Sequence, residues 1–141
     1  MKVLVLNGSP KKERSDCMRL TNAFLAGLGE TAEIVNAIEA NVKPCLGCYA
    51  CWWKTPGKCC QPDDMATILP TITGSDLVIF SMPLYNFGMP STIKAIADRL
   101  LPCVKGDQAT AEDGSTYHPV RAERKTCFML ISGCGFPCGT R

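Results

Sequence analysis

The sequence predicts an α/β protein built on a parallel sheet, and three observations support this fold class. Short apolar runs alternate with segments in which apolar residues recur every three or four positions. The resulting order of strand, helix, strand and helix requires crossover connections, and therefore parallel strands. Loops rich in glycine or proline follow three of the expected strands, at the edge where an open parallel sheet binds ligands.

The expected elements follow from these patterns. Apolar runs predict strands over residues 3–6, 33–36, 76–81 and 125–131. Apolar residues that share one face predict helices over residues 16–28, 63–72 and 90–101. Asp63 and Asp64 are interpreted as the cap of the second helix. Residues 103–124 are polar and aperiodic, so we expect a long loop there. No linker divides residues 1–141, which predicts a single domain.

Composition limits the class of protein. The chain has 141 residues, of which 46% are apolar and 20% are charged, as is typical of one globular domain. A formal net charge of +2 does not favour nucleic acid, and no apolar run is long enough for a signal peptide or a membrane span. We therefore expect a cytoplasmic protein with neither a nucleic-acid nor a membrane partner. Ten cysteines in such a compartment favour metal, cluster or redox roles over disulfides.

The turn after the first expected strand suits an anion. Asn7–Pro10 interrupts the apolar run, and a helical pattern begins near Asp16. The first backbone N–H groups of a helix have no internal partner and carry partial positive charge. The hydroxyl and cationic side chains that would add to these donors are those of Ser9, Lys11, Lys12, Arg14 and Ser15. The turn predicts a phosphate site, with an ordinary capped helix start as the alternative.

Residues 40–62 form a loop rich in cysteine, inserted before the second helix and called the Cys loop below. Its spacing, Cys45-x2-Cys48-x2-Cys51-x7-Cys59, is compact and resembles the ligation of iron–sulfur clusters in ferredoxins. These four cysteines are candidate metal ligands, with Cys60 as the adjacent alternative to Cys59. Three other interpretations stay open: a zinc site, a redox pair of Cys48 and Cys51, and free thiols in a loop used for packing or oligomer contacts.

Several motifs together resemble a known family. In order they are Asn7–Pro10, Arg14–Asp16, Cys45–Trp53, Gly57–Cys59, Asp63–Met65, Pro83–Pro90, Lys94, Asp98–Arg99 and Cys134–Pro137. They resemble the flavodoxin-like NAD(P)H-dependent FMN reductases and, within them, the iron–sulfur flavoprotein branch. The resemblance implies a flavodoxin-like, doubly wound parallel sheet with FMN at the switch point between the first and third strands. It also implies NAD(P)H as co-substrate.

The resemblance further implies which residues bind the cofactors. The FMN phosphate would be held by Ser9, Lys11, Arg14, Ser15 and Cys17. Cys17 stands where the family usually has threonine, and a thiol is a weak hydrogen-bond donor. The flavin ring would lie along the loop that contains Pro83, Leu84, Tyr85, Asn86, Phe87 and Gly88, and its other edge would be closed by Ser132, Gly133 and Cys134. The branch implies a 4Fe–4S cluster on Cys45, Cys48, Cys51 and Cys59.

One feature departs from the family. The flavodoxin-like sheet has five strands in the order 2-1-3-4-5, whereas this sequence ends after the fourth. We therefore expect the order 2-1-3-4 in a C-terminally incomplete domain, with the fourth strand as an exposed edge. Either the sequence is a truncated product or a partner subunit of a homo-oligomer covers the gap.

The expected function is that of an FMN-dependent NAD(P)H oxidoreductase that passes electrons to a small-molecule or protein acceptor. The flavin carries the redox chemistry, so the candidate residues are binding residues and no catalytic side chain is expected. A cluster on the Cys loop is the hypothetical exit for electrons. Two alternatives stay open: a flavodoxin-type electron carrier without nicotinamide activity, and a non-enzymatic metal- or thiol-binding protein.

Overall fold

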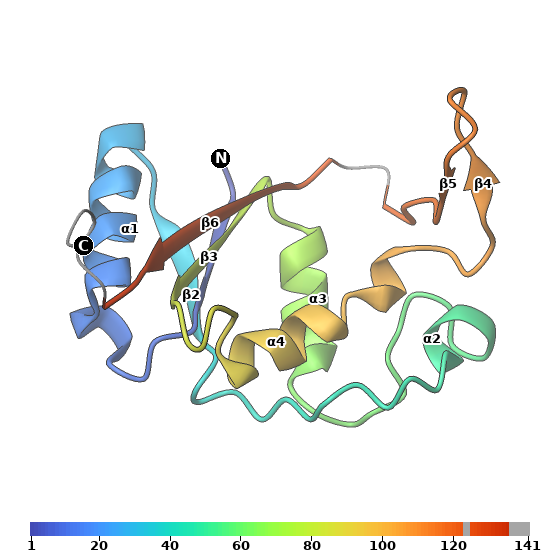
Figure 1. The fold of residues 1–141 in the computed structure, drawn as a ribbon, viewed down its shortest axis with the longest axis horizontal. Coiled ribbons are helices and arrows are strands. Elements are labelled where there is room, and N and C mark those ends of the chain that lie inside the picture. The colour runs from blue at the N-terminus through green and yellow to red at the C-terminus, as the bar shows by residue number, and fades with distance from the viewer. Residues whose placement is uncertain (123–124, 136–141) are drawn as a thin grey trace.

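The central sheet of the chain has four parallel strands with helices on both faces (Figure 1). The structure, a computed structural model, describes residues 1–122 and 125–135. The strands run in the order β2-β1-β3-β6 and are β1 (Val3–Asn7), β2 (Ala32–Asn36), β3 (Leu77–Pro83) and β6 (Cys127–Gly133). This order confirms the predicted 2-1-3-4 arrangement. Phe136 and Pro137, part of the last predicted motif, lie outside the described residues.

β1 is the buried centre of the sheet. All five of its residues are buried, as expected for a continuous apolar strand that is covered on both faces. Its last residue, Asn7, pairs with Asn36 of β2 on one side and Ser81 of β3 on the other. β3 continues along β6 until Pro83 pairs with Gly133. The carboxyl ends of β1, β3 and β6 therefore lie at one edge of the sheet.

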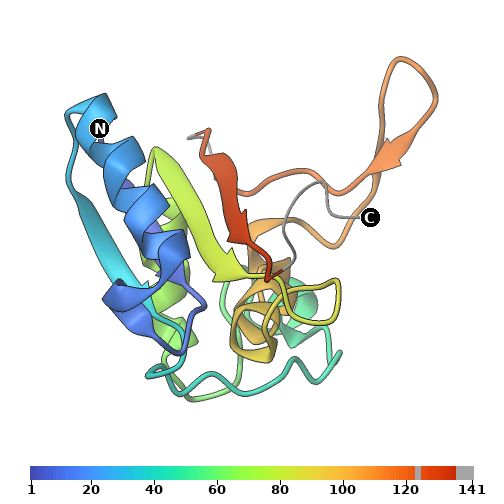
Figure 2. The same ribbon diagram turned by 60° about the vertical axis from the view of Figure 1, so that its left-hand side comes forward.

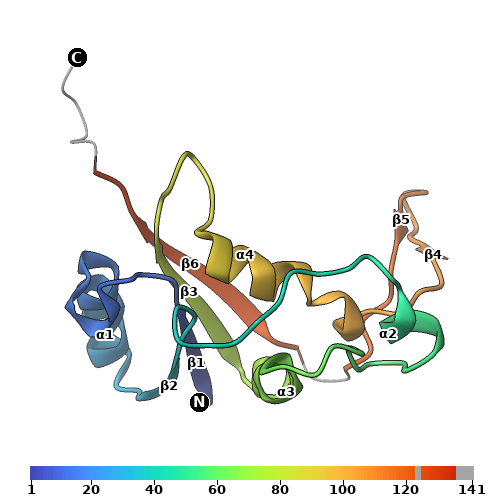
Figure 3. The ribbon, with the colours of Figure 1, turned by 90° about the horizontal axis from the view of Figure 1, so that it is seen from below.

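Two helical layers enclose the sheet (Figure 3). The long helices are α1 (Asp16–Leu28) on one face, and α3 (Met65–Thr73) and α4 (Ser91–Asp98) on the other. Successive residues of β1 point to opposite faces, so Val3 and Val5 pack on the α1 side. Leu4 and Leu6 pack on the α3 and α4 side. Each layer thus has its own apolar core.

Two segments that were predicted as loops contain short regular structure. α2 (Ala50–Trp53) lies within the Cys loop, and β4 (Ala109–Thr110) pairs with β5 (Thr116–Tyr117) in an antiparallel hairpin. Single 3-10 turns, η1 (Lys12–Arg14) and η2 (Leu101–Cys103), precede α1 and follow α4. Figure 2 shows the hairpin projecting away from the sheet. The prediction missed these elements because they are too short to produce an apolar period.

β6 is the outer strand of the described sheet, where it pairs only with β3. Two of its apolar side chains, Phe128 and Leu130, are 56% and 57% exposed. A cavity of about 550 Å³ separates this strand from α3 and is lined by Ile72, Thr73 and Phe128, among others. In the described residues, no helix is long and apolar enough to cross a membrane.

The turn after β1 provides a test of the core packing. A Cβ atom on Gly8 would lie 2.5 Å from Ile93 Cγ1 and 3.0 Å from Met82 Cβ. We expect Gly8→Ala to lower the free energy of unfolding by about 1–3 kcal/mol, measured by urea denaturation. Gly27→Ala in α1 is the control, because its added Cβ meets nothing within 4 Å. This variant should raise the free energy of unfolding by about 0.4–1 kcal/mol. Equal stabilities of the two variants would contradict this packing.

Candidate functional site

Three loops meet at the carboxyl edge of the sheet and enclose a cavity of about 260 Å³, called the strand-end cavity below. The loops follow β1, β3 and β6, as the parallel pairing of these strands requires. The lining residues are Ser9, Lys11, Ser15, Asp16, Cys17, Pro83, Tyr85, Gly133, Cys134 and Gly135. An open parallel sheet binds its ligands at this position.

The loop after β1 is held in place by buried hydrogen bonds. Asn7, which is fully buried, donates from Nδ2 to Asn36 Oδ1 at 2.9 Å and accepts from the backbone N–H of Ser9 at 3.0 Å. Ser15 is the N-cap of α1, and its Oγ accepts from the N–H of Met18 at 3.2 Å. Ser9 Oγ accepts from the N–H of Lys11 at 3.3 Å. Each of these two hydroxyls therefore keeps its own hydrogen for a ligand.

The charged residues of this loop divide between the cavity and the outer surface. Lys11 lines the cavity, whereas Lys12 has a left-handed backbone (φ 50°) and pairs with Glu39. Arg14 is exposed and does not line the cavity. The carboxylate of Asp16 also reaches the cavity, but it is paired with Arg19 at 3.1 Å. Lys11 is therefore the cation of this loop that can face a bound anion.

Cys17 lies on the inner wall of the cavity. It is buried in the first turn of α1, and a Cβ on Gly133 would come within 3.3 Å of its sulfur. Gly133 thus allows the end of β6 to approach α1 closely. One turn later, Thr21 Oγ1 donates to the carbonyl of Cys17 and lies 2.9 Å from Ser81 Oγ. The sequence analysis missed this Thr21–Ser81 contact, which ties α1 to β3.

The loop after β3 forms a tight turn at the rim of the cavity. The backbones of Tyr85 and Gly88 exchange hydrogen bonds of 3.1 and 2.9 Å. Asn86 and Phe87 between them both have positive φ, 46° and 61°, which is the pattern of a type I′ turn. A phenylalanine is rarely found in this conformation, and this one is 87% exposed. The turn therefore presents an aromatic ring to the outside at the edge of the cavity.

The structure brings most of the predicted binding residues together. Eight of them line the strand-end cavity, namely Ser9, Lys11, Ser15, Cys17, Pro83, Tyr85, Gly133 and Cys134. Leu84, Asn86 and Phe87 line a hollow of about 230 Å³ that shares Cys134 and Gly135 with it. Arg14, Gly88 and Ser132 line neither. Asp16 and Gly135 were missed, although both are sequence neighbours of predicted residues.

The Cys loop is a separate site at the other end of the molecule from α1 (Figures 1 and 3). Its five cysteines, Cys45, Cys48, Cys51, Cys59 and Cys60, surround a void of about 20 Å³ together with Arg99 and Pro102. The sulfurs of Cys48 and Cys60 are 3.7 Å apart. Among the residues that the structure describes, no three His, Cys, Asp or Glu side chains are grouped to hold a single metal ion.

The thiols of the Cys loop differ in acidity. The backbone N–H of Ala50 and the neighbouring Cys60 thiol lower the pKa of Cys48. The same contact with Cys48 raises the pKa of Cys60, and burial raises that of Cys51. Cys48 is therefore more easily converted to a thiolate, the form that binds metals, than Cys51 or Cys60.

A buried ion pair closes the base of the Cys loop. The side chains of Arg99 and Asp63 are 1% and 0% exposed, and Nη1 of Arg99 donates to Asp63 Oδ2. Burial by itself raises the pKa of Asp63, but the hydrogen bonds from Arg99 and from the N–H groups of Lys43 and Met65 hold it below its usual value. The interpretation of Asp63 and Asp64 as a helix cap was therefore incomplete. Asp63 does accept from Met65 at 3.2 Å, but its main partner is Arg99.

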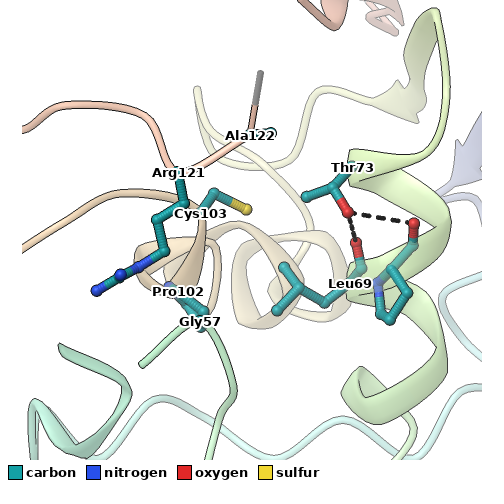
Figure 4. Close-up of a pocket in the computed structure, with 8 residues that line it drawn as sticks. Gly57, Leu69, Thr73, Pro102, Cys103, Arg121 and Ala122 are labelled. Atoms are coloured by element: carbon teal, nitrogen blue, oxygen red, sulfur yellow. Dashed lines mark hydrogen bonds between the residues drawn. The ribbon is translucent and has the colours of Figure 1, made fainter. Parts of the chain in front are cut away.

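A further cavity of about 260 Å³ lies between α3, η2 and the segment before β6 (Figure 4). Thr73 Oγ1 turns back to the carbonyl groups of Leu69 and Pro70, 3.2 Å from each. Arg121 points away from Thr73 in Figure 4, and its Nε donates to the carbonyl of Val104 at 3.1 Å. Thr73 and the Nε of Arg121 therefore bond to backbone carbonyl groups of the chain itself.

Comparison with known proteins gives a consistent result. Residues 1–119 match the family described as NADPH-dependent FMN reductase. An iron-sulfur flavoprotein of Methanocaldococcus jannaschii is 32% identical, with 77% of this chain and 56% of that protein covered. An FMN-dependent NADH:quinone oxidoreductase of Pseudoalteromonas atlantica is 30% identical, with 98% and 71% covered. The chain spans about half the length of the first of these relatives.

Solved structures share the fold. An FMN-dependent NADH-azoreductase from Bacillus anthracis, in complex with FMN, has a TM-score of 0.65 at 20% identity, with 99% of this chain and 71% of that chain covered. An NAD(P)H:quinone oxidoreductase from Methanothermobacter marburgensis has a TM-score of 0.67 at 20% identity, with 97% and 65% covered. These similarities confirm the flavodoxin-like fold.

The buried ion pair provides a test of the Cys loop. Asp63→Asn leaves the buried charge of Arg99 without compensation, so we expect the free energy of unfolding to fall by about 3–5 kcal/mol in urea denaturation at pH 7. Asp98→Asn is the matched control, because Asp98 pairs with Lys94 on the exposed surface of α4. Asp98→Asn should lower the free energy of unfolding by less than about 1 kcal/mol. Similar losses in both variants would show that the Arg99–Asp63 pair is not buried.

The lowered pKa of Asp63 also predicts how this difference depends on pH. A carboxylate with a depressed pKa stabilises the fold above its unfolded pKa of about 3.9, and this contribution is lost as the pH falls through the folded value. The stability gap between wild type and Asp63→Asn should therefore be constant from pH 5 to 7 and narrow below about pH 4. A difference in the free energy of unfolding that becomes larger in acid would contradict a lowered pKa of Asp63.

Proposed function

We propose that the chain, which belongs to the NADPH-dependent FMN reductase family, binds FMN in the strand-end cavity and passes electrons from NAD(P)H to an acceptor. The observation that supports this most is the convergence of three loops, distant in sequence, on one cavity. The cavity combines two hydroxyls, a lysine and a helix N-terminus, which together suit a phosphate group.

The phosphate end of the proposed site is formed by the loop after β1. Ser9 and Ser15 would donate their hydroxyl hydrogens, since each oxygen already accepts a backbone N–H. Lys11 would offset part of the phosphate charge. Arg14 lies in the 3-10 turn η1 and does not line the cavity, so its role toward the phosphate stays a prediction. Cys17 would contribute shape rather than a strong hydrogen bond.

The ring end of the proposed site lies between the loops after β3 and β6. Tyr85 is half-exposed and Phe87 is almost fully exposed, so both side chains have aromatic surface to cover a planar ring. Leu84 donates its N–H to the carbonyl of Gly133 at 2.9 Å, which fixes the two loops relative to each other. When bound, FMN would supply the redox chemistry by accepting a hydride from NAD(P)H. The chain's own residues would orient the ring and exclude water from it.

A quinone-class compound is the proposed acceptor. The relatives that cover most of this chain include several FMN-dependent NADH:quinone oxidoreductases. Quinones are planar and aromatic, and the exposed aromatic turn at residues 85–88 provides a matching surface beside the cavity.

A 4Fe–4S cluster on the Cys loop is the second part of the proposal. Its support is the set of five thiols around one void, with a buried arginine beside them, and four relatives named iron-sulfur flavoproteins. The present void of about 20 Å³ holds roughly one water molecule, so the thiols must move apart to admit a cluster. The helices α1 and α2, which belong to the two sites, lie at opposite ends of the chain (Figure 1), and we propose that the cluster exchanges electrons with the FMN of a second copy in the expected homo-oligomer.

Anaerobic absorbance spectroscopy tests the main proposal. Chain loaded with FMN should show flavin bands near 450 nm that bleach on mixing with NADH or NADPH and recover on adding a quinone. Bleaching by dithionite but by neither nicotinamide would indicate an electron carrier instead. Failure to retain FMN at all would exclude the flavoprotein assignment and leave the metal- or thiol-binding alternative.

The role of Lys11 can be tested with two flavins. Lys11→Gln should weaken FMN binding about tenfold, which corresponds to about 1.4 kcal/mol, in a fluorescence titration. Riboflavin lacks the phosphate, so its affinity should be unchanged. Lys2→Gln makes the same charge change at the amino end of β1 and should affect neither flavin. An equal loss for FMN and riboflavin would place the phosphate elsewhere.

A further inference from the structure

Arg99 is a buried cation with an incomplete set of hydrogen bonds. It directly follows α4, and its side chain is 1% exposed. One nitrogen, Nη1, donates to Asp63 and, at 3.1 Å, to the carbonyl of Lys43. The other two, Nε and Nη2, are buried and have no hydrogen-bond partner among the described residues. Buried donors without partners are rare in native proteins and call for an explanation.

The unpaired donors belong to a side chain that lines the void of the Cys loop. Arg99 shares this void with all five cysteines of the loop. An arginine stays protonated in proteins, so its guanidinium is a permanent positive charge. Arg99 therefore brings a permanent and fully buried positive charge to the void that the five cysteines line.

The partners of Arg99 also hold the two ends of the Cys loop together. Asp63 Oδ2 accepts from the N–H of Lys43 at 3.0 Å, and Asp64 Oδ2 accepts from the N–H of Asn41 at 2.8 Å. Residues 41–43 and 63–64 thus form a clasp at the base of the loop, and Arg99 bonds to both sides of it. This clasp fixes the position of the guanidinium independently of the thiols above it.

The chemistry of a cluster accounts for this arrangement. Four thiolate ligands give an iron–sulfur cluster a net negative charge, and hydrogen bonds to its sulfur atoms raise its reduction potential. A fixed arginine with two unpaired donor nitrogens supplies both a compensating charge and donors in fork geometry. If the void stayed empty or held an apolar group, the neighbouring Cys59 thiol would be the one acceptor close to these donors, and a thiol is a weak acceptor.

We propose that Arg99 is a positioning residue for an iron–sulfur cluster on the Cys loop, with Nε and Nη2 donating to its cysteine or sulfide sulfur. The inference rests on the cluster part of the proposed function and is independent of FMN binding. Asp63 acts through Arg99, because it holds the guanidinium in place. The expected consequence is a cluster with a higher reduction potential than the same ligands would give without Arg99.

The test is anaerobic reconstitution of the whole chain with iron and sulfide, followed by redox titration with EPR detection. Arg99→Lys keeps the charge but removes the planar fork, and Arg19→Lys is the matched control on exposed α1. At a fixed solution potential near the midpoint potential of the wild-type cluster, Arg99→Lys should raise the ratio of oxidised to reduced cluster about tenfold. This corresponds to a midpoint potential that is lower by about 59 mV for one electron. The control should match wild type.

A second variant covers the risk that Arg99→Lys does not fold. Arg99→Gln combined with Asp63→Asn removes both charges together, so no buried charge is left unpaired. In one expected outcome, this double variant keeps its cluster and shows a higher ratio of oxidised to reduced cluster than wild type. In the other, it loses iron, while the urea midpoint of the iron-free chain stays close to that of the iron-free wild type. Either result supports the inference.

Two results would overturn the inference. One is a variant that keeps its iron and shows the wild-type potential. The other is a wild-type chain that takes up no iron under these conditions. Flavin absorbance, measured on the same samples, reports separately on the FMN proposal, so failure of one proposal is distinguishable from failure of the other.

Discussion

The parallel pairing of β1 with β3, and of β3 with β6, is the constraint on which the rest of the structure depends. It places Asn7, Ser81 and Gly133 at one edge of the sheet, so the three loops that follow must meet there. Within β1, successive residues point to opposite helical layers, which accounts for the two cores. The strand-end cavity is therefore a consequence of register, with its chemistry supplied by the loops.

Much of this arrangement could be predicted because it is encoded locally. The buried strands are unbroken apolar runs, and α1 has a serine N-cap with a regular apolar face. Details set by backbone conformation could not be predicted. Spacing alone put Lys11 and Arg14 near the same anion, whereas in the structure Lys11 lines the strand-end cavity and Arg14, in the turn η1, does not. The hairpin β4–β5 was missed because two-residue strands carry no period.

Arg99 and Asp63 show a second limit of sequence reasoning. They lie 36 positions apart, and each has an ordinary local interpretation, as a residue at a helix end or in a helix cap. Only the tertiary structure shows that they form one buried pair below the Cys loop. A buried pair of this kind does little for stability compared with apolar residues, so its presence points to a need for a fixed charge at this place. In this way the fold provides two sites of different chemistry, one at the strand ends and one beyond α4.

The central claim is that FMN binds where the three strand-end loops meet, and amide NMR during an FMN titration tests it most directly. The account predicts that the largest shift changes fall on residues 8–18, 84–88 and 133–135, with the Cys loop unaffected. Riboflavin should reproduce the changes at residues 84–88 and 133–135 but only a fraction of those at residues 8–18. Changes centred on the Cys loop or on the α3–η2 cavity would contradict the account.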